Sequence, residues 1–138
     1  MIQFVAIDTP VPFDNFEEVR GWVERVIQSF GKKTGEVFFL FCSDQYLFEM
    51  NLKHLEHDTF TDIITFDLSE SNDFIGGEMY ISVDRIMENS KLLGIASIEE
   101  IHRVMIHGVL HLLGYKDKAK TDEAEMRRQE NYCLSLRS

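Results

Sequence analysis

A pair of histidines four residues apart is the feature of this sequence with the clearest chemistry. His107 and His111 stand in an apolar run, and side chains at positions i and i+4 lie on one face of a helix with Cβ atoms roughly 5–6 Å apart. One metal ion can be bound by both rings at that separation. Gly114 follows and can adopt the left-handed conformation that reverses the chain, which would bring Asp117 back toward the histidines.

Together these three side chains match the ligand set of a catalytic metal site. Zinc binds imidazole nitrogen and carboxylate oxygen at about 2.0–2.2 Å, and three protein ligands leave the fourth position open. We therefore expect His107, His111 and Asp117 to hold one ion of zinc or another divalent metal that supports hydrolysis. In the alternative interpretation both histidines are hydrogen-bonded core side chains, and Asp117 belongs to an ordinary polar loop.

The residue after the first histidine argues against a zinc peptidase. In the H-E-x-x-H helix of metalloproteases this position holds the glutamate that acts as general base, whereas here it is Gly108. A glycine inside a helix costs about 1 kcal/mol relative to alanine. Gly108 therefore indicates either the close approach of another segment or a substrate, or a tolerated packing position.

Three stretches of the chain together resemble one known family. Residues 107–115 read H-G-V-L-H-L-L-G-Y, which is similar to the H-G-x-L-H-L-x-G-Y-D-H signature of the YbeY family of bacterial metal-dependent endoribonucleases. Asn51 with residues 61–66, T-D-I-I-T-F, resembles the family's asparagine followed by T-D-V-L-S-F, and residues 77–82, G-E-M-Y-I-S, resemble its G-D-I-x-I-S strand. The order and spacing of all three agree over most of the chain.

The resemblance implies an enzyme, a metal-dependent hydrolase that cuts single-stranded RNA during ribosomal RNA maturation and ribosome quality control. It also implies ribosomal RNA and the small ribosomal subunit or its assembly proteins as partners. Two other functions remain open from the sequence. One is a non-catalytic ribosome-assembly factor with a structural metal, and the other is a metal hydrolase acting on another substrate.

The sequence departs from the family pattern at two places. Asp117 stands where the family has its third histidine, preceded by Lys116 in place of an aspartate. A carboxylate ligand lowers the net charge of the metal centre and favours harder ions such as manganese or magnesium. Leu55 stands where the family typically has an arginine expected to meet the substrate phosphate. The neighbouring side chains that could supply that charge, or simply be solvated, are Lys53, His54 and His57.

Further polar residues are candidates for the site. Asp62 and Glu78 match family motif positions and could orient a metal-bound histidine or act as a base, or else form hydrogen bonds near turns. Tyr115 is expected to be a packed aromatic. Arg103 precedes His107 by four residues on the same helix face and is a candidate phosphate contact. The other candidates for that role, each also readable as surface charge, are Lys116, Lys118 and Lys120.

Charge is unevenly distributed along the chain. The net charge is −10, which opposes approach of a polyanion at long range. Residues 1–100 contain 7 Lys and Arg against 19 Asp and Glu, whereas residues 101–138 contain 7 against 5. The proposed ligands therefore lie in the only basic third of the chain.

Length and composition fit one cytoplasmic domain over residues 1–138, with 44% hydrophobic residues and 11 Phe to build a core. Cys42 and Cys133 have no metal-ligand spacing, which indicates a reduced protein. The start of the chain lacks the basic segment of a signal peptide, and no apolar run reaches membrane-spanning length, so no membrane partner is expected.

Hydrophobic patterning predicts an α+β fold, with a four-stranded mixed sheet covered by helices and the metal site on the C-terminal half of a central helix. Asp14 is expected to cap the first helix, and Ser97 with Glu100 to form a capping box that opens the histidine helix. The third and fourth strands are expected to pair antiparallel. The predicted strands are 2–7, 36–42, 61–68 and 78–83, and the predicted helices are 14–30, 44–52, 84–93, 97–113 and 121–134.

Overall fold

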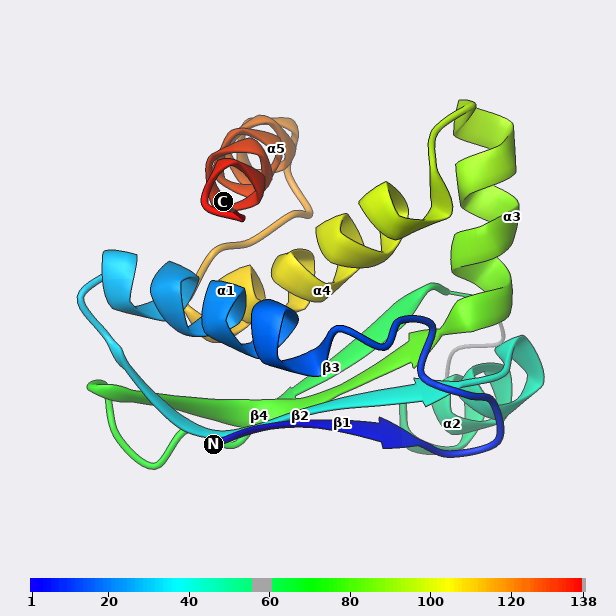
Figure 1. Ribbon diagram of the computed structural model, residues 1–138, viewed down its shortest axis with the longest axis horizontal. Coiled ribbons are helices and arrows are strands. Elements are labelled where there is room, and N and C mark those ends of the chain that lie inside the picture. The colour runs from blue at the N-terminus through cyan, green and yellow to red at the C-terminus, as the bar shows by residue number, and fades with distance from the viewer. Residues whose placement is uncertain (56–60, 138) are drawn as a thin grey trace.

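The computed structural model describes residues 1–55 and 61–137, with the backbone alone for His54 and Leu55. The described residues form a four-stranded sheet and five helices arranged in layers (Figure 1). The predictions for the side chains of His54, Leu55 and His57 lie outside the described residues. In chain order the elements are β1 (Ile2–Ala6), α1 (Phe16–Ser29), β2 (Lys33–Cys42), α2 (Asp44–Leu55), β3 (Ile63–Asp67), β4 (Phe74–Ser82), α3 (Val83–Leu93), α4 (Ser97–Leu112) and α5 (Lys120–Ser135).

The sheet is mixed, with the strand order β1-β2-β4-β3. β1 pairs with β2 and β2 with β4 in parallel, while β3 pairs with β4 antiparallel. The predicted fold class and the antiparallel pair are therefore confirmed. A parallel pair needs a long crossover, and α1 supplies it between β1 and β2.

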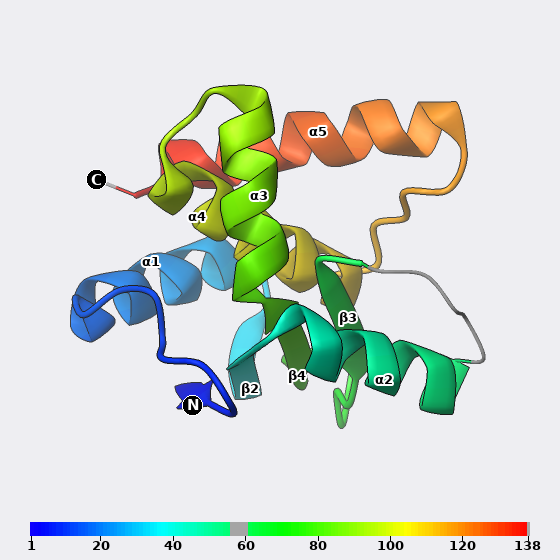
Figure 2. The ribbon, with the colours of Figure 1, turned by 90° about the vertical axis from the view of Figure 1, so that its right-hand side faces the viewer.

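Helices cover the two faces of the sheet unequally. α1 and α4 pack on one face over the main hydrophobic core, and α5 lies over α4 on the side away from the sheet (Figure 1). α2 covers the opposite face where β2 and β4 end and β3 begins (Figure 2), and a smaller cluster is formed there by Cys42, Leu47 and Ile64. Among residues 1–55 and 61–137, no helix combines the length and apolarity needed to cross a membrane.

Element boundaries differ from the sequence predictions where tertiary contacts decide them. Asp14 does not cap α1, because Asn15 occupies the N-cap position, and Ala96 rather than Ser97 is the N-cap residue of α4. Neither cap residue makes a side-chain cap hydrogen bond, so the predicted capping box does not form. β4 begins at Phe74, earlier than expected, because its first residues pair with the start of β2.

The histidine helix lies unusually close to the sheet at Gly108. A Cβ atom on Gly108 would lie 2.6 Å from Met79 Sδ and 2.8 Å from Ile63 Cδ1. The sheet offers a matching gap at Gly77, where a Cβ atom would lie 2.8 Å from Leu112 Cδ2 of α4. Of the interpretations left open by the sequence, the close approach of another segment is therefore the one the structure supports.

Replacing Gly108 by alanine should destabilise the protein. Overpacking of a core typically costs about 1–3 kcal/mol, which outweighs the gain of about 1 kcal/mol in helix propensity. The matched control is Gly21→Ala in α1, where the new Cβ would meet only the flexible Arg25 side chain at 3.5 Å. Urea unfolding should show Gly108→Ala less stable and Gly21→Ala more stable than the parent. Equal stability of the two variants would contradict this account of the contact.

A buried histidine on α4 should make stability depend on pH. His102 is 9% exposed, lies against Trp22, and its Nδ1 is 3.1 Å from Arg137 Nη1. Burial, with the nearby Arg137 charge, lowers the pKa of His102 from 6.5 to about 4. Because Arg137 can only donate, Nδ1 accepts, and the neutral ring is the form that fits.

The free energy of unfolding should therefore fall as the pH is lowered from about 6.5 to about 4, where the unfolded chain binds a proton at His102 and the folded chain does not. The His102 contribution is present in full above pH 6.5 and amounts to about 3 kcal/mol across this window. Urea titrations of the parent and of His102→Gln at several pH values measure it. Parallel stability curves for the two proteins would exclude this role for His102.

Candidate metal centre

The end of α4 turns the chain back onto the histidine face. Gly114 has φ of 101°, a left-handed conformation, and donates its N–H to His111 O at 3.0 Å. Tyr115 donates to Leu110 O at 3.0 Å, which completes the paired hydrogen bonds of a Schellman motif. The Tyr115 ring packs on Phe30, as expected for a packed aromatic. This reversal brings Asp117 beside the two imidazoles, as predicted from the sequence.

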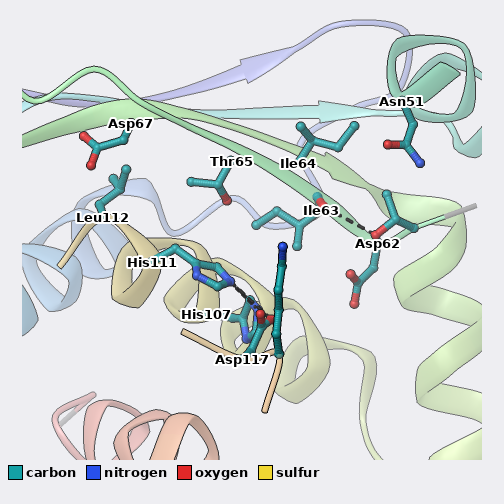
Figure 3. A pocket seen from close by; sticks show the side chains of 12 residues that line it. Asn51, Asp62, Ile63, Ile64, Thr65, Asp67, His107, His111, Leu112 and Asp117 are labelled. Atoms are coloured by element: carbon teal, nitrogen blue, oxygen red, sulfur yellow. Dashed lines mark hydrogen bonds and ion pairs between the residues drawn. The ribbon is translucent and has the colours of Figure 1, made fainter. Parts of the chain in front are cut away.

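Three ligand atoms converge there (Figure 3). Asp117 Oδ2 lies 3.0 Å from His107 Nε2 and 3.3 Å from His111 Nε2, and the two Nε2 atoms are 3.0 Å apart. An ion bound tetrahedrally at the usual zinc distances would hold its ligand atoms about 3.3 Å apart. The donor set and its spacing therefore fit one divalent ion with an open coordination position.

Hydrogen bonds on the far side of each ring fix which nitrogen faces the cluster. His111 Nδ1 lies 3.0 Å from the Tyr115 carbonyl oxygen, which can only accept, so Nδ1 donates. His107 Nδ1 lies 2.8 Å from Glu130 Oε2 and donates to that carboxylate. Both Nε2 atoms are thereby directed at Asp117. A hydrogen-bond acceptor behind each metal-ligating histidine is the usual arrangement in protein metal sites.

The cluster requires a positive charge at its centre. With both Nδ1 atoms donating outward, two Nε2 lone pairs and the Asp117 carboxylate point at one another. Burial acts to lower the pKa of His107, but the hydrogen bond and charge of Glu130 and the charge of Asp117 outweigh it and raise that pKa above its ordinary value. A proton can lie between only two of these atoms at once, whereas a divalent ion contacts all three.

Glu130 joins α5 to the histidine helix. Its carboxyl group is buried, which by itself raises the pKa, but hydrogen bonds from His107 and Arg103 lower the pKa below its usual range. Arg103 Nη1 lies 2.9 Å from Glu130 Oε1, and its Nη2 lies 3.0 Å from Asn131 Oδ1. The guanidinium predicted as a phosphate contact is thus directed at α5, where it holds the carboxylate that orients His107.

A cavity of about 610 Å³ opens in front of the ligands. Figure 3 shows Asp62 on the opposite wall, above His107 and Asp117, and burial raises the pKa of this carboxyl group. Lys118 also lines the cavity, whereas Lys116 and Lys120 do not. Glu78, the other acidic residue predicted to orient a histidine, lies on the other face of the sheet.

The Glu78 side chain lies on the face of the sheet away from α4. Its Oε1 atom accepts a 3.4 Å hydrogen bond from the Tyr80 hydroxyl. Met79, its neighbour along β4, faces Gly108 of α4, and side chains alternate along a strand. Glu78 therefore points away from the histidines and does not orient them.

A comparison with known protein families agrees with this geometry. The family model described as Endoribonuclease YbeY matches residues 8–137. The chain belongs to the YbeY family. The match includes every element from α1 to α5 and all three residues of the candidate metal site.

Individual members of the YbeY family are similar to this chain over nearly their whole length. The Endoribonuclease YbeY of Flavobacterium psychrophilum is 45% identical over 134 residues, covering 96% of this chain and 95% of the relative. That of Parabacteroides distasonis is 40% identical over 135 residues, covering 98% and 94%. The solution structure of TM1509 from Thermotoga maritima is similar in fold, with a TM-score of 0.67 and 22% identity, covering 99% of this chain and 89% of that one.

Glu130 was not predicted from the sequence, although a signal was present. It lies on the apolar stripe of α5 with Met126, Cys133 and Leu134, all buried. A carboxylate at such a position is rarely buried without a partner. The spacing from His107 is 23 residues, so no local pattern could identify that partner.

Removing the Glu130 carboxylate should weaken metal binding. Loss of a partner behind a metal-ligating histidine typically costs about 10–100-fold in affinity. We expect that loss for Glu130→Ala in a competition titration with a chromogenic chelator. Glu123→Ala, which removes an exposed acid from the first turn of the same helix, is the control. Unchanged affinity in Glu130→Ala would refute the orienting role.

Proposed function

We propose that the protein is a metal-dependent endoribonuclease that cuts single-stranded RNA in ribosomal RNA maturation and ribosome quality control in the cytoplasm. The observation that carries the proposal is the convergence of His107, His111 and Asp117 in an open cavity. Membership of the Endoribonuclease YbeY family supports the reaction and the RNA substrate.

The protein's own groups have distinct tasks in this reaction. His107, His111 and Asp117 would hold the metal, with zinc or a harder divalent ion suited to two imidazoles and one carboxylate. When bound, such an ion polarises a phosphodiester and lowers the pKa of water. Glu130 and the Tyr115 carbonyl keep both rings directed at the cavity. Lys118 on its wall provides a positive charge toward the RNA backbone.

The stretch of chain that supplies His107, His111 and Asp117 is basic, although the whole chain is acidic. Within residues 101–138, Lys and Arg outnumber Asp and Glu by 7 to 5. The remaining acidic surface repels a free polyanion, an effect that salt screens. A protein with this charge distribution suits RNA presented by a ribosomal partner, and we propose the small subunit or its assembly proteins as that partner.

Removing one ligand should abolish both metal binding and cleavage. We expect His111→Ala to lose its divalent ion, because two ligands remain of three, and to lose at least about a hundredfold in RNA cleavage. Asp117→His, which introduces the histidine of the family pattern, should keep both. His102→Gln removes a histidine of the same helix outside the cluster and should also keep both.

Metal content by mass spectrometry and cleavage of a labelled single-stranded oligoribonucleotide, with and without chelator, measure these effects. Full metal content in His111→Ala would refute the ligand set. Ribosome binding that survives chelation, without any RNA cleavage by the metal-loaded parent, would instead support the assembly-factor function.

A further inference from the structure

A second cavity, of about 560 Å³, lies beside the metal ligands where α3, α4, α5 and the start of β3 meet. It shares His107 and Asp117 with the metal centre. Part of its lining is apolar and open to solvent, since Leu93 and Ile95 are 64% and 41% exposed. Cavities of this size accommodate small organic groups, with a few polar atoms setting their orientation.

Glu100 lines this cavity and is 6% exposed. Within the part of the chain that the structure describes, no hydrogen bond or ion pair reaches its carboxylate. The helix cap predicted for it does not form. Both arginines of the cavity are directed at another acid, with Arg103 Nη1 at 2.9 Å and Arg127 Nη1 at 3.6 Å from Glu130 Oε1. Among the residues that the structure describes, Glu100 therefore has no counter-charge within 4 Å.

An unpaired carboxylate on the wall of this cavity favours a ligand that donates hydrogen bonds, because a group that displaces water from the carboxylate must replace the hydrogen bonds of that water. Burial first, and then the nearby charge of Asp62, raises the pKa of Glu100. Asp117 and Glu130 bring the number of carboxylates that line the cavity to four, against two arginines that both pair with Glu130. The carboxylates repel a phosphate group, so the part of an RNA strand that fits beside the metal centre is a base.

We propose that this cavity is a nucleobase subsite, in which Glu100 accepts hydrogen bonds from the Watson–Crick edge of an unstacked base. Guanine fits best, because its adjacent N1–H and N2–H groups match the two oxygens of one carboxylate. Uracil presents one N–H between two carbonyl oxygens, which a carboxylate repels. Leu93 and Ile95 are placed to cover a face of the base. The subsite rests on the proposed function, because it assigns substrate preference to the same reaction.

Binding measured without metal tests the subsite apart from cleavage. Labelled uridine oligomers carrying one central guanosine, uridine or abasic residue are titrated in chelator and followed by fluorescence anisotropy. The parent should bind the guanosine oligomer about tenfold more tightly than the uridine oligomer. Glu100→Gln replaces one acceptor by an amide donor and should reduce that ratio to about twofold or less.

Glu99→Gln is the matched control for charge. It removes the same charge one residue earlier on α4, where the carboxylate binds Arg137 at 2.8 Å, and should keep the guanosine preference. Leu93→Ser changes an exposed side chain and should weaken binding of the guanosine oligomer while leaving the abasic oligomer unaffected.

The proposal is overturned if the parent does not distinguish guanosine from uridine, or if Glu100→Gln retains the full preference. It is also overturned if Glu100→Gln loses the metal, which would give Glu100 a role in the metal centre. Guanosine preference in a protein that never cleaves RNA would refute the proposed function and keep the subsite. Cleavage without base preference would refute the subsite alone.

Discussion

The position of the histidine pair depends on α4 being held from both sides. On the sheet side, Gly108 lets the helix approach Met79 and Ile63 closely. On the outer side, Arg103 and His107 bind one carboxylate of α5. The close contact with the sheet fixes the position of α4, and the interaction with the Glu130 carboxylate fixes the orientation of the His107 ring. Interiors packed this densely resist small displacements, which is what a constellation of ligand atoms about 3 Å apart requires.

Local sequence patterns predicted the features of the site that local interactions produce. The spacing of His107 and His111 and the chain reversal at Gly114 are properties of one helix and its end, and both are as expected. The four-stranded mixed sheet also follows from hydrophobic patterning, as does the pairing of the last two strands. The capping box failed because Ser97 lies one residue inside the helix, and helix ends are decided within a turn by competing contacts.

The features that were missed depend on residues distant in sequence. Glu130 and the guanidinium of Arg103 meet only because α5 folds back across α4. Arg103 is on the predicted helix face, yet its role is set by an acid 27 residues away. Gly108 left two interpretations open, and only the position of the sheet distinguishes them. Patterning assigns residues to faces, whereas tertiary structure decides which faces meet.

The attachment of α5 also sets the order in which the site can be completed. The Trp22 indole donates a 2.8 Å hydrogen bond to the carbonyl of Cys133, and Arg25 donates to the Leu136 carbonyl, so the first helix anchors the last one described. α5 is synthesised after every other element and carries the carboxylate that orients His107. A nascent chain without α5 has both imidazoles but lacks the group that aligns one of them, so the candidate metal site is complete only late in biosynthesis.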